Sequence, residues 1–173
     1  MGREFSERFV WAAGIIDPRP GEELLEIGCG HGELIDVIAD REPRYRITAI
    51  DRSAKMTTAA VGRNADHIAQ GIARIEHCEL LKNLFESHSF DKAFAYNMNV
   101  FWMDPAAELA EVRRLLKPKG KFYLFHRPPP GGGPAEYAAA FRQNLEIAGY
   151  AILKETYNLA DKVNAVGIVS TPA

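Results

Sequence analysis

Short apolar runs alternate with segments of helical periodicity through most of the chain, and this alternation limits the fold more than any other feature. The apolar residues between Leu34 and Ile38 recur at the spacing of one helix face, shortly after one such run. Strands that alternate with helices form parallel sheets with right-handed crossovers. Seven runs predict strands, at residues 23–27, 46–50, 73–77, 92–96, 121–126, 151–157 and 164–170.

The end of the chain departs from this alternation. The last two runs are separated by little more than "NLADKV", which is too short for a helical crossover, so we expect them to pair antiparallel. Two further helices are predicted before them. One follows "MDPAAE", with Asp104 as its cap and "KPKG" as its stop, and the other covers residues 134–147. The sequence therefore predicts an α/β fold.

Composition and charge restrict the class of protein. The 173 residues predict a single domain, residues 1–173, whose helical arm over residues 1–20 contains a helix at 6–16. With 21 basic and 23 acidic residues, the net charge of −2 gives no sign of a nucleic-acid or membrane partner. Two cysteines form no disulfide framework, no Cys/His spacing resembles a zinc site, and the charged N-terminus is unlike a signal peptide. We expect a cytoplasmic protein without a metal.

The stretch "LLEIGCGHGEL" places Gly28, Gly30 and Gly32 directly after the first predicted strand. Ligands of parallel α/β sheets bind outside the carboxyl ends of the strands, where such a turn lies. Gly28 allows a sharp turn, Gly30 lets a ligand approach the backbone, and Gly32 opens a helix whose amides face the ligand. A tight turn without a ligand is the alternative.

The spacing of this motif distinguishes two classes of ligand. A dinucleotide fingerprint has its third glycine at the position of Glu33, where a carboxylate repels a pyrophosphate. The motif instead begins with Glu26 and reads E-x-G-x-G-x-G, which suits a ligand that is cationic or zwitterionic there. A nicotinamide-dependent oxidoreductase is therefore disfavoured.

Asp51 ends the second predicted strand in "ITAID", 19 residues after Gly32. An acidic residue at this tip accepts hydrogen bonds from both hydroxyls of a ribose. The alternative role, a cap for the next helix, is one that Ser53 already fits. We therefore expect Asp51 to bind a ribose.

Gly28, Gly30, Gly32 and Asp51 resemble the cofactor site of class I S-adenosylmethionine-dependent methyltransferases. The stretches "SFDKAFAYNMNVFW" and "DPAAELAEVRRLLKPKGKFYLF" are similar to the fourth strand, the following helix and the fifth strand of that family. The motifs occur in the family's order across roughly residues 20–126. The resemblance implies a doubly wound, seven-stranded, mostly parallel sheet with the last strand antiparallel and helices on both faces. It also implies S-adenosyl-L-methionine as cofactor and S-adenosyl-L-homocysteine as product.

The resemblance further assigns roles to single residues. Glu79 and Leu80 should lie beside the adenine, where the family usually has Asp or Ser followed by Ala, and Asn97 should lie near the transferred methyl group. Met56 either packs on the adenine or belongs to the core, and Cys29 is a buried filler rather than a nucleophile. The cofactor-binding residues that we expect are Glu26, Gly28, Cys29, Gly30, Gly32, Asp51, Arg52, Met56, Glu79, Leu80 and Asn97.

The implied reaction is transfer of the methyl group of S-adenosylmethionine to an O, N, S or C atom of a small-molecule acceptor. Asn97 is one candidate catalytic residue. A base, where the acceptor must lose a proton, would be His126 or Tyr96, at the ends of the fifth and fourth predicted strands. For both, a structural role is the alternative. Phe101 and Trp102 form either an apolar wall for the acceptor or part of the core.

The chain offers little that would enclose a large acceptor. After the fifth predicted strand it has only "RPPPGGGP", which is either a mobile gate or a plain connector. No basic and aromatic pattern suits RNA. We therefore expect a small-molecule partner, no nucleic acid, no membrane, and a monomer or homodimer. The alternative function is a non-catalytic S-adenosylmethionine-binding regulatory or partner protein.

Overall fold

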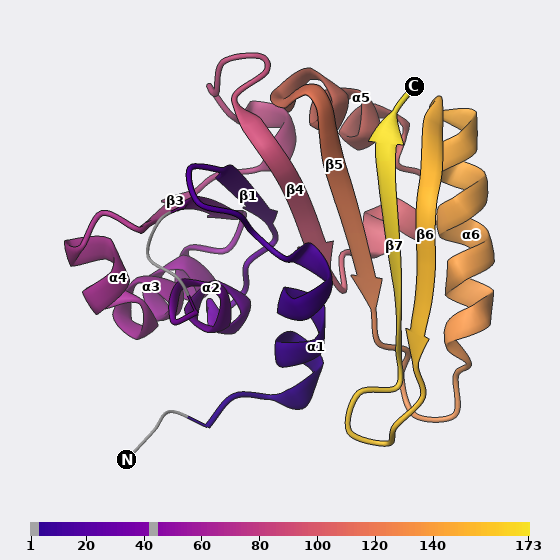
Figure 1. Ribbon diagram of the computed structural model, residues 1–173, viewed down its shortest axis with the longest axis horizontal. Coiled ribbons are helices and arrows are strands. Elements are labelled where there is room, and N and C mark those ends of the chain that lie inside the picture. Colours follow the sequence, from indigo (N-terminus) through magenta and orange to yellow (C-terminus); the bar gives the residue numbers. More distant parts are fainter. Residues whose placement is uncertain (1–3, 42–44) are drawn as a thin grey trace.

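A computed structural model describes residues 4–41 and 45–173 and consists of one sheet covered by helices on both faces (Figure 1). The strands are β1 (Glu23–Ile27), β2 (Arg46–Asp51), β3 (Ala73–His77), β4 (Phe90–Tyr96), β5 (Leu116–His126), β6 (Tyr150–Asn158) and β7 (Ala165–Pro172). The helices are α1 (Glu7–Ile16), α2 (Glu33–Ala39), α3 (Ala54–Arg63), α4 (Ala65–Ala69), α5 (Ala106–Leu115) and α6 (Pro134–Ile147), with 3-10 turns η1 (Leu80–Lys82) and η2 (Asn99–Trp102). Among the described residues, no helix has the length and hydropathy needed to cross a membrane.

The seven strands follow the order β3-β2-β1-β4-β5-β7-β6. β1 pairs in parallel with both β2 and β4, so strand order reverses between β1 and β4. β7 lies between β5 and β6 and is antiparallel to both. The predicted doubly wound, seven-stranded, mostly parallel sheet with its last strand antiparallel is therefore confirmed.

The largest differences from the sequence prediction lie around α5. The prediction that Asp104 caps this helix is wrong, because Pro105 is the cap residue and no side chain caps the helix. The Pro105 carbonyl accepts the first helical hydrogen bond, from Leu109 N–H at 2.8 Å, so the helix begins one residue later than expected. The helix ends at Leu115, as "KPKG" predicted, but that stretch itself lies within β5, where the pairing with β4 is irregular.

The predicted N-terminal arm has a helix close to the expected place. Helix α1 begins at Glu7, with Ser6 as its cap residue, and ends at Ile16. Of the arm predicted over residues 1–20, residues 1–3 lie outside the described residues. Figure 1 shows α1 beside the sheet, on the same side as α2.

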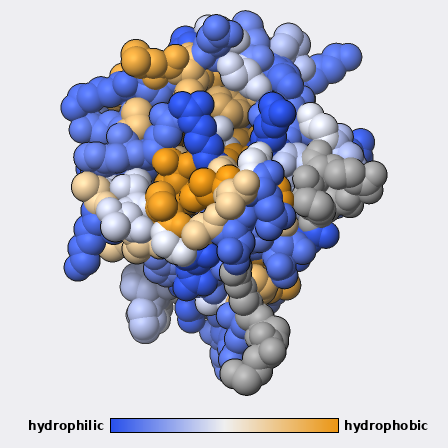
Figure 2. Space-filling view, turned by 90° about the vertical axis from the view of Figure 1, so that its left-hand side faces the viewer, coloured by the Kyte–Doolittle hydropathy of each residue, from blue (hydrophilic) through white to orange (hydrophobic). Residues whose placement is uncertain are grey.

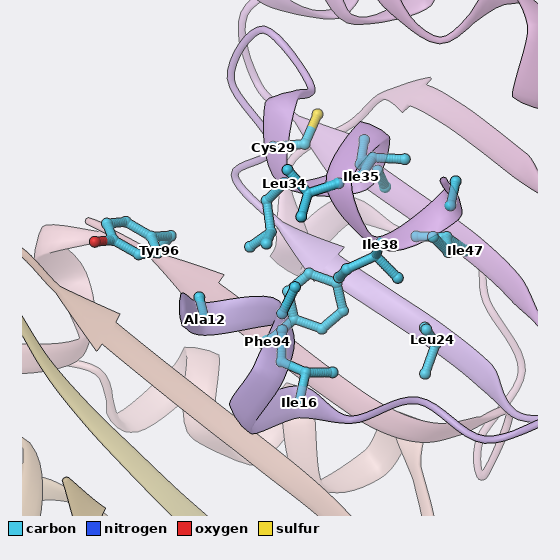
Figure 3. Close-up of a cluster of buried hydrophobic side chains, with 14 of the residues drawn as sticks. Ala12, Ile16, Leu24, Cys29, Leu34, Ile35, Ile38, Ile47, Phe94 and Tyr96 are labelled. Atoms are coloured by element: carbon cyan, nitrogen blue, oxygen red, sulfur yellow. The ribbon is translucent and has the colours of Figure 1, made fainter. Parts of the chain in front are cut away.

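Two clusters of buried side chains hold the helices to the sheet, one on each face. The cluster on the α1 and α2 side includes Phe94 of β4, and Figure 3 shows Ile16 and Ile38 next to its ring. The cluster on the α5 and α6 side includes Phe101 and Phe122, whose ring centroids are 5.1 Å apart. Because both faces are covered, the central strands consist mainly of apolar residues.

Helix α2 is buried along its whole length, including its charged residues. Its Asp36 Oδ1 lies 3.0 Å from His67 Nε2, and its Oδ2 lies 3.5 Å from Arg63 Nη1, which compensates the buried charge. Its Glu33 Oε1 accepts a 2.8 Å hydrogen bond from Ser6 N–H. Burial opposes ionisation of Glu33, yet the hydrogen bonds from Ser6 and the Arg63 charge hold the Glu33 pKa below its usual value. Helix α2 thus anchors both α4 and the start of α1.

The edges of the sheet are strands β3 and β6. Figure 2 shows the β3 side of the molecule, where hydrophilic residues surround a small hydrophobic patch. On β3, Arg74 Nε and Glu76 Oε1 form an ion pair at 2.6 Å. Charged side chains on an edge strand oppose pairing with a second sheet.

Phe94→Ala tests the assignment of the core. We expect the free energy of unfolding to fall by about 3–5 kcal/mol, because the substitution removes a fully buried ring and leaves a cavity between α1, α2 and β4. Urea denaturation measures the change. Ile147→Ala is the control, because Ile147 is 77% exposed, and its effect should stay within about 0.5 kcal/mol. Equal losses for the two variants would contradict the assignment.

Candidate functional site

A cavity of about 410 Å³ lies at the carboxyl ends of β1, β2 and β4. Strand order reverses there, which is where open α/β sheets bind their ligands. Its lining contains six of the residues predicted to bind a cofactor, namely Gly28, Asp51, Arg52, Glu79, Leu80 and Asn97. The other five, Glu26, Cys29, Gly30, Gly32 and Met56, do not line it.

The three glycines of the turn have different surroundings, although all have positive φ, at 74°, 54° and 80°. A Cβ at Gly32 would lie 2.5 Å from Asn64 Nδ2, so packing against the end of α3 requires a glycine there. A Cβ at Gly28 would lie 2.2 Å from the sulfur of Met98. At Gly30 a Cβ would meet nothing within 4 Å. The turn therefore has open space over Gly30 that the packing of the described residues does not fill.

The Asp51 carboxylate joins this turn to the tip of β2. Its Oδ2 accepts a 2.9 Å hydrogen bond from Gly30 N–H, and its Oδ1 accepts a 2.8 Å hydrogen bond from Ser53 N–H. Ser53 itself caps α3, since its hydroxyl accepts from Met56 N–H at 3.4 Å. Because a carboxylate has about four lone-pair positions, Asp51 keeps acceptor capacity at the cavity that it lines.

Glu26 lies inside β1 and is 2% exposed. Its Oε2 has no hydrogen-bond partner among the described residues. Burial, and then the nearby Asp51 charge, raise the pKa of Glu26 well above its usual value. A buried carboxyl group with a free oxygen fits a ligand that brings a hydrogen-bond donor or a positive charge.

Glu79 and Leu80, which follow β3, form another side of the cavity. Glu79 is exposed, and its Oε1 accepts a 2.9 Å hydrogen bond from Lys82 Nζ, which lowers the pKa of Glu79. Leu80 is buried beside it and lines the cavity. Met56 is 38% exposed on α3, so it belongs neither to the core nor to the cavity lining. Cys29 is buried, and burial raises the pKa of its thiol, which leaves it protonated.

The two candidate bases lie on opposite faces of the sheet. Tyr96 packs in the α1-side cluster, with ring centroids 5.0 Å from Phe9, and burial raises its pKa to about 12. His126 stacks on Tyr137 of α6 at 4.0 Å, and burial lowers its pKa to about 4. Neither residue lines the cavity, and neither the Tyr96 hydroxyl nor the two ring nitrogens of His126 have a partner among the described residues.

Asn97 follows β4 directly and lines the cavity, with a positive φ of 56°. Its N–H donates to the Phe125 carbonyl at 2.9 Å, and its Oδ1 accepts from Arg127 N–H at 2.8 Å. Of the two aromatic residues predicted as wall or core, Phe101 is fully buried, and Trp102 packs edge-on against Tyr137 at 5.2 Å. Neither lines the cavity.

Several residues that line the cavity were not predicted. Met98, Asn99 and Val100 follow Asn97 in the loop after β4, so their position beyond a central strand was a usable signal. Glu108 reaches the cavity from the first turn of α5, for which the sequence carries no local signal. Within residues 4–41 and 45–173, no group of three His, Cys, Asp or Glu residues is arranged to hold a metal ion.

Comparisons with known proteins agree with this geometry. Residues 25–124 match the family described as "Methyltransferase domain". The chain is 31% identical over 117 residues to nocamycin O-methyltransferase from Saccharothrix syringae, covering 67% of this chain and 41% of that protein. It is 28% identical over 120 residues to demethylmenaquinone methyltransferase from Chlamydia pneumoniae, covering 69% and 50%. The chain thus spans half or less of the length of these curated relatives.

Solved structures share the fold at low sequence identity. The [4+2]-cyclase SpnF has a TM-score of 0.76 at 16% identity, covering 96% of this chain and 81% of that one. A geranyl diphosphate methyltransferase in complex with geranyl diphosphate and sinefungin has a TM-score of 0.76 at 14% identity, covering 97% and 78%. At such identities the likeness extends to the fold alone.

Substituting alanine at Gly32 and at Gly30 should show which of the two glycines is required by packing and which faces open space. Gly30→Ala should lower the free energy of unfolding by about 1–2 kcal/mol, the cost of a side chain at positive φ. Gly32→Ala should lower it by roughly 2–5 kcal/mol, because the clash with α3 adds to the same backbone cost. Urea denaturation compares the two. If Gly30→Ala destabilises as much as Gly32→Ala, the space over Gly30 is not open.

Proposed function

We propose, because the chain belongs to the class I S-adenosylmethionine-dependent methyltransferase family, that it transfers the methyl group of S-adenosylmethionine to a small-molecule acceptor. The observation that carries the proposal is the open space over Gly30, next to the Asp51 carboxylate at the point where strand order reverses. The atom that accepts the methyl group is O, N, S or C.

The residues present fit this cofactor. The open space over Gly30 would take the methionine part against the backbone, and the Asp51 carboxylate, which lines the cavity, would accept from the ribose hydroxyls. The free Oε2 of Glu26 suits the positive charges that the cofactor carries. Glu79 and Leu80 flank the space left for the adenine, with the Glu79 carboxylate able to accept from its amino group.

S-adenosylmethionine supplies, when bound, a methyl group activated by a positively charged sulfur. The chain's contribution is then mainly alignment, which is worth up to about 7–11 kcal/mol of the barrier in ideal cases. Asn97 is the residue proposed to sit closest to the reacting atoms, because it lines the cavity and its side chain is fixed by the Arg127 amide. S-adenosylhomocysteine is the product.

Neither candidate base is placed to act without a rearrangement. Tyr96 is protonated at neutral pH, since its pKa is about 12, and is therefore a hydrogen-bond donor there. His126 is neutral and covered by Tyr137, outside the cavity lining. The proposal therefore favours an acceptor whose nucleophile is free of its proton before transfer.

A second candidate is a protein that binds S-adenosylmethionine without transferring its methyl group. It is favoured by the Glu79–Leu80 pair, which replaces the family's usual residues at the adenine. Formation of S-adenosylhomocysteine, measured with a panel of small acceptors, separates the two. Turnover with any acceptor supports the first candidate, and cofactor binding without turnover across the panel supports the second.

Asp51→Ala should weaken the binding of S-adenosylmethionine by roughly 2–3 kcal/mol, because two ribose hydroxyls lose a charged acceptor. Isothermal titration calorimetry on the purified protein measures the change. Asp161→Ala, which removes the same charge from an exposed turn, is the control and should bind as the unsubstituted protein does. Unchanged binding by Asp51→Ala would mean that the cofactor site is elsewhere.

Gly30→Val should abolish cofactor binding while the protein stays folded. The valine side chain would occupy the open space in which the cofactor is proposed to lie against the backbone. Circular dichroism establishes the fold and calorimetry the loss of binding. A folded Gly30→Val protein that binds S-adenosylmethionine normally would overturn this placement.

A further inference from the structure

A buried tyrosine hydroxyl without a partner lies where the end of β4 meets the first turn of α1. Tyr96 is 8% exposed, and its hydroxyl forms no hydrogen bond with any described residue. Figure 3 shows this hydroxyl pointing away from the aliphatic side chains of the core cluster. The ring of Phe9 packs edge-on against Tyr96, and the Arg8 guanidinium lies over the Phe9 ring at 4.5 Å. An unpartnered buried hydroxyl is costly unless a ligand or water completes its hydrogen bonding.

Two arginines without counter-ions lie close to this hydroxyl. Arg8 and Arg127 are near enough that their charges lower the pKa of Tyr96, although burial raises it more. Within the described part of the chain neither guanidinium forms an ion pair, and Arg8 Nε is buried without a hydrogen bond. The nearby carboxylates have other partners, since Glu7 pairs with Lys162 at 2.8 Å and Glu33 binds the Ser6 amide. Both guanidinium groups therefore remain available to an anionic ligand.

Asn97 connects this group of residues to the cavity, although Arg8, Tyr96 and Arg127 do not line it themselves. Arg127 N–H donates to Asn97 Oδ1 at 2.8 Å, and Asn97 both follows Tyr96 in the chain and lines the cavity. A ligand held by the arginines would thus have its remaining atoms near the end of the cavity at which Asn97 lies. The Phe9 and Trp11 rings, both partly buried, offer an apolar surface beside the two arginines and Tyr96.

We propose that Arg8, Arg127 and the Tyr96 hydroxyl bind an anionic group, a carboxylate or a phosphate, of the molecule that accepts the methyl group. Guanidinium groups bind both anions through paired N–H donors, and the phenol adds a third donor. In this arrangement the Arg8 guanidinium, which lies over the Phe9 ring, would turn towards the anion on binding. The inference rests on the proposed function for its reaction, but the anion site is testable without the cofactor.

Calorimetric titration with benzoate and with phenyl phosphate tests the site, with benzamide as the uncharged probe. We expect at least one anionic probe to bind about tenfold or more tightly than benzamide, because hydrogen bonds to a charged acceptor are stronger than those to a neutral one. The tighter of the two anions identifies the group as carboxylate or phosphate. Arg8→Gln and Arg127→Gln should each weaken that binding by about tenfold. Tyr96→Phe, which keeps the ring packing, should weaken it severalfold.

Arg74→Gln is the matched control, because it removes the same charge from the β3 edge. It should leave probe binding unchanged, and all four variants should bind S-adenosylmethionine as the unsubstituted protein does. The anion site is overturned if neither anionic probe binds better than benzamide, or if Arg74→Gln weakens binding as much as the other arginine variants. Failure of the unsubstituted protein to bind S-adenosylmethionine would instead count against the proposed function and leave the probe result valid.

Discussion

Hydrogen bonds from the glycine turn to the end of β2 fix the conformation of this turn, which its flexible glycines alone would not maintain. The Ile50 carbonyl accepts from Gly28 N–H at 2.8 Å and from Cys29 N–H at 3.0 Å, and the Asp51 carboxylate accepts from Gly30 N–H. Three residues of the turn have positive φ, and glycines lose much conformational entropy when they are ordered. These bonds offset that loss, and they place Asp51 and the open space over Gly30 side by side. The cavity depends on this arrangement.

The fold could be predicted because its signals are local. Each of the seven apolar runs corresponds to a strand, since strands buried on both faces consist of short apolar segments between turn residues. The antiparallel position of β7 followed from the length of one connection. The early start of β5 was missed because pairing with a distant strand decides it. Pro118 can lie in β5 because the pairing of β5 with β4 is irregular there. The residues around Pro118 give no sign of this irregularity, since it depends on β4.

The candidate site was predictable in part for a related reason. The glycines and Asp51 could be recognised from their positions directly after predicted strands, and Gly28 and Asp51 do line the cavity. The candidate bases Tyr96 and His126 do not line the cavity. The face of the sheet on which each side chain lies depends on the register of the strands, which the sequence does not show locally. Tyr96 pairs with Phe125 and shares its face, so His126, one residue later, lies on the other. A slip of one residue between β4 and β5 would pair Tyr96 with His126 and put both on one face, and register is set by contacts far apart in the chain.

Glu33 connects the glycine turn to the arm that carries Arg8. Its position suggested a charge that repels pyrophosphate, yet the carboxylate does not line the cavity and binds the Ser6 amide instead. The first residue of α2 therefore holds the start of α1, and α2 itself begins directly after Gly32. Because Phe9 of α1 also packs against Tyr96, the glycine turn and the proposed anion site are both in contact with this one arm of the chain.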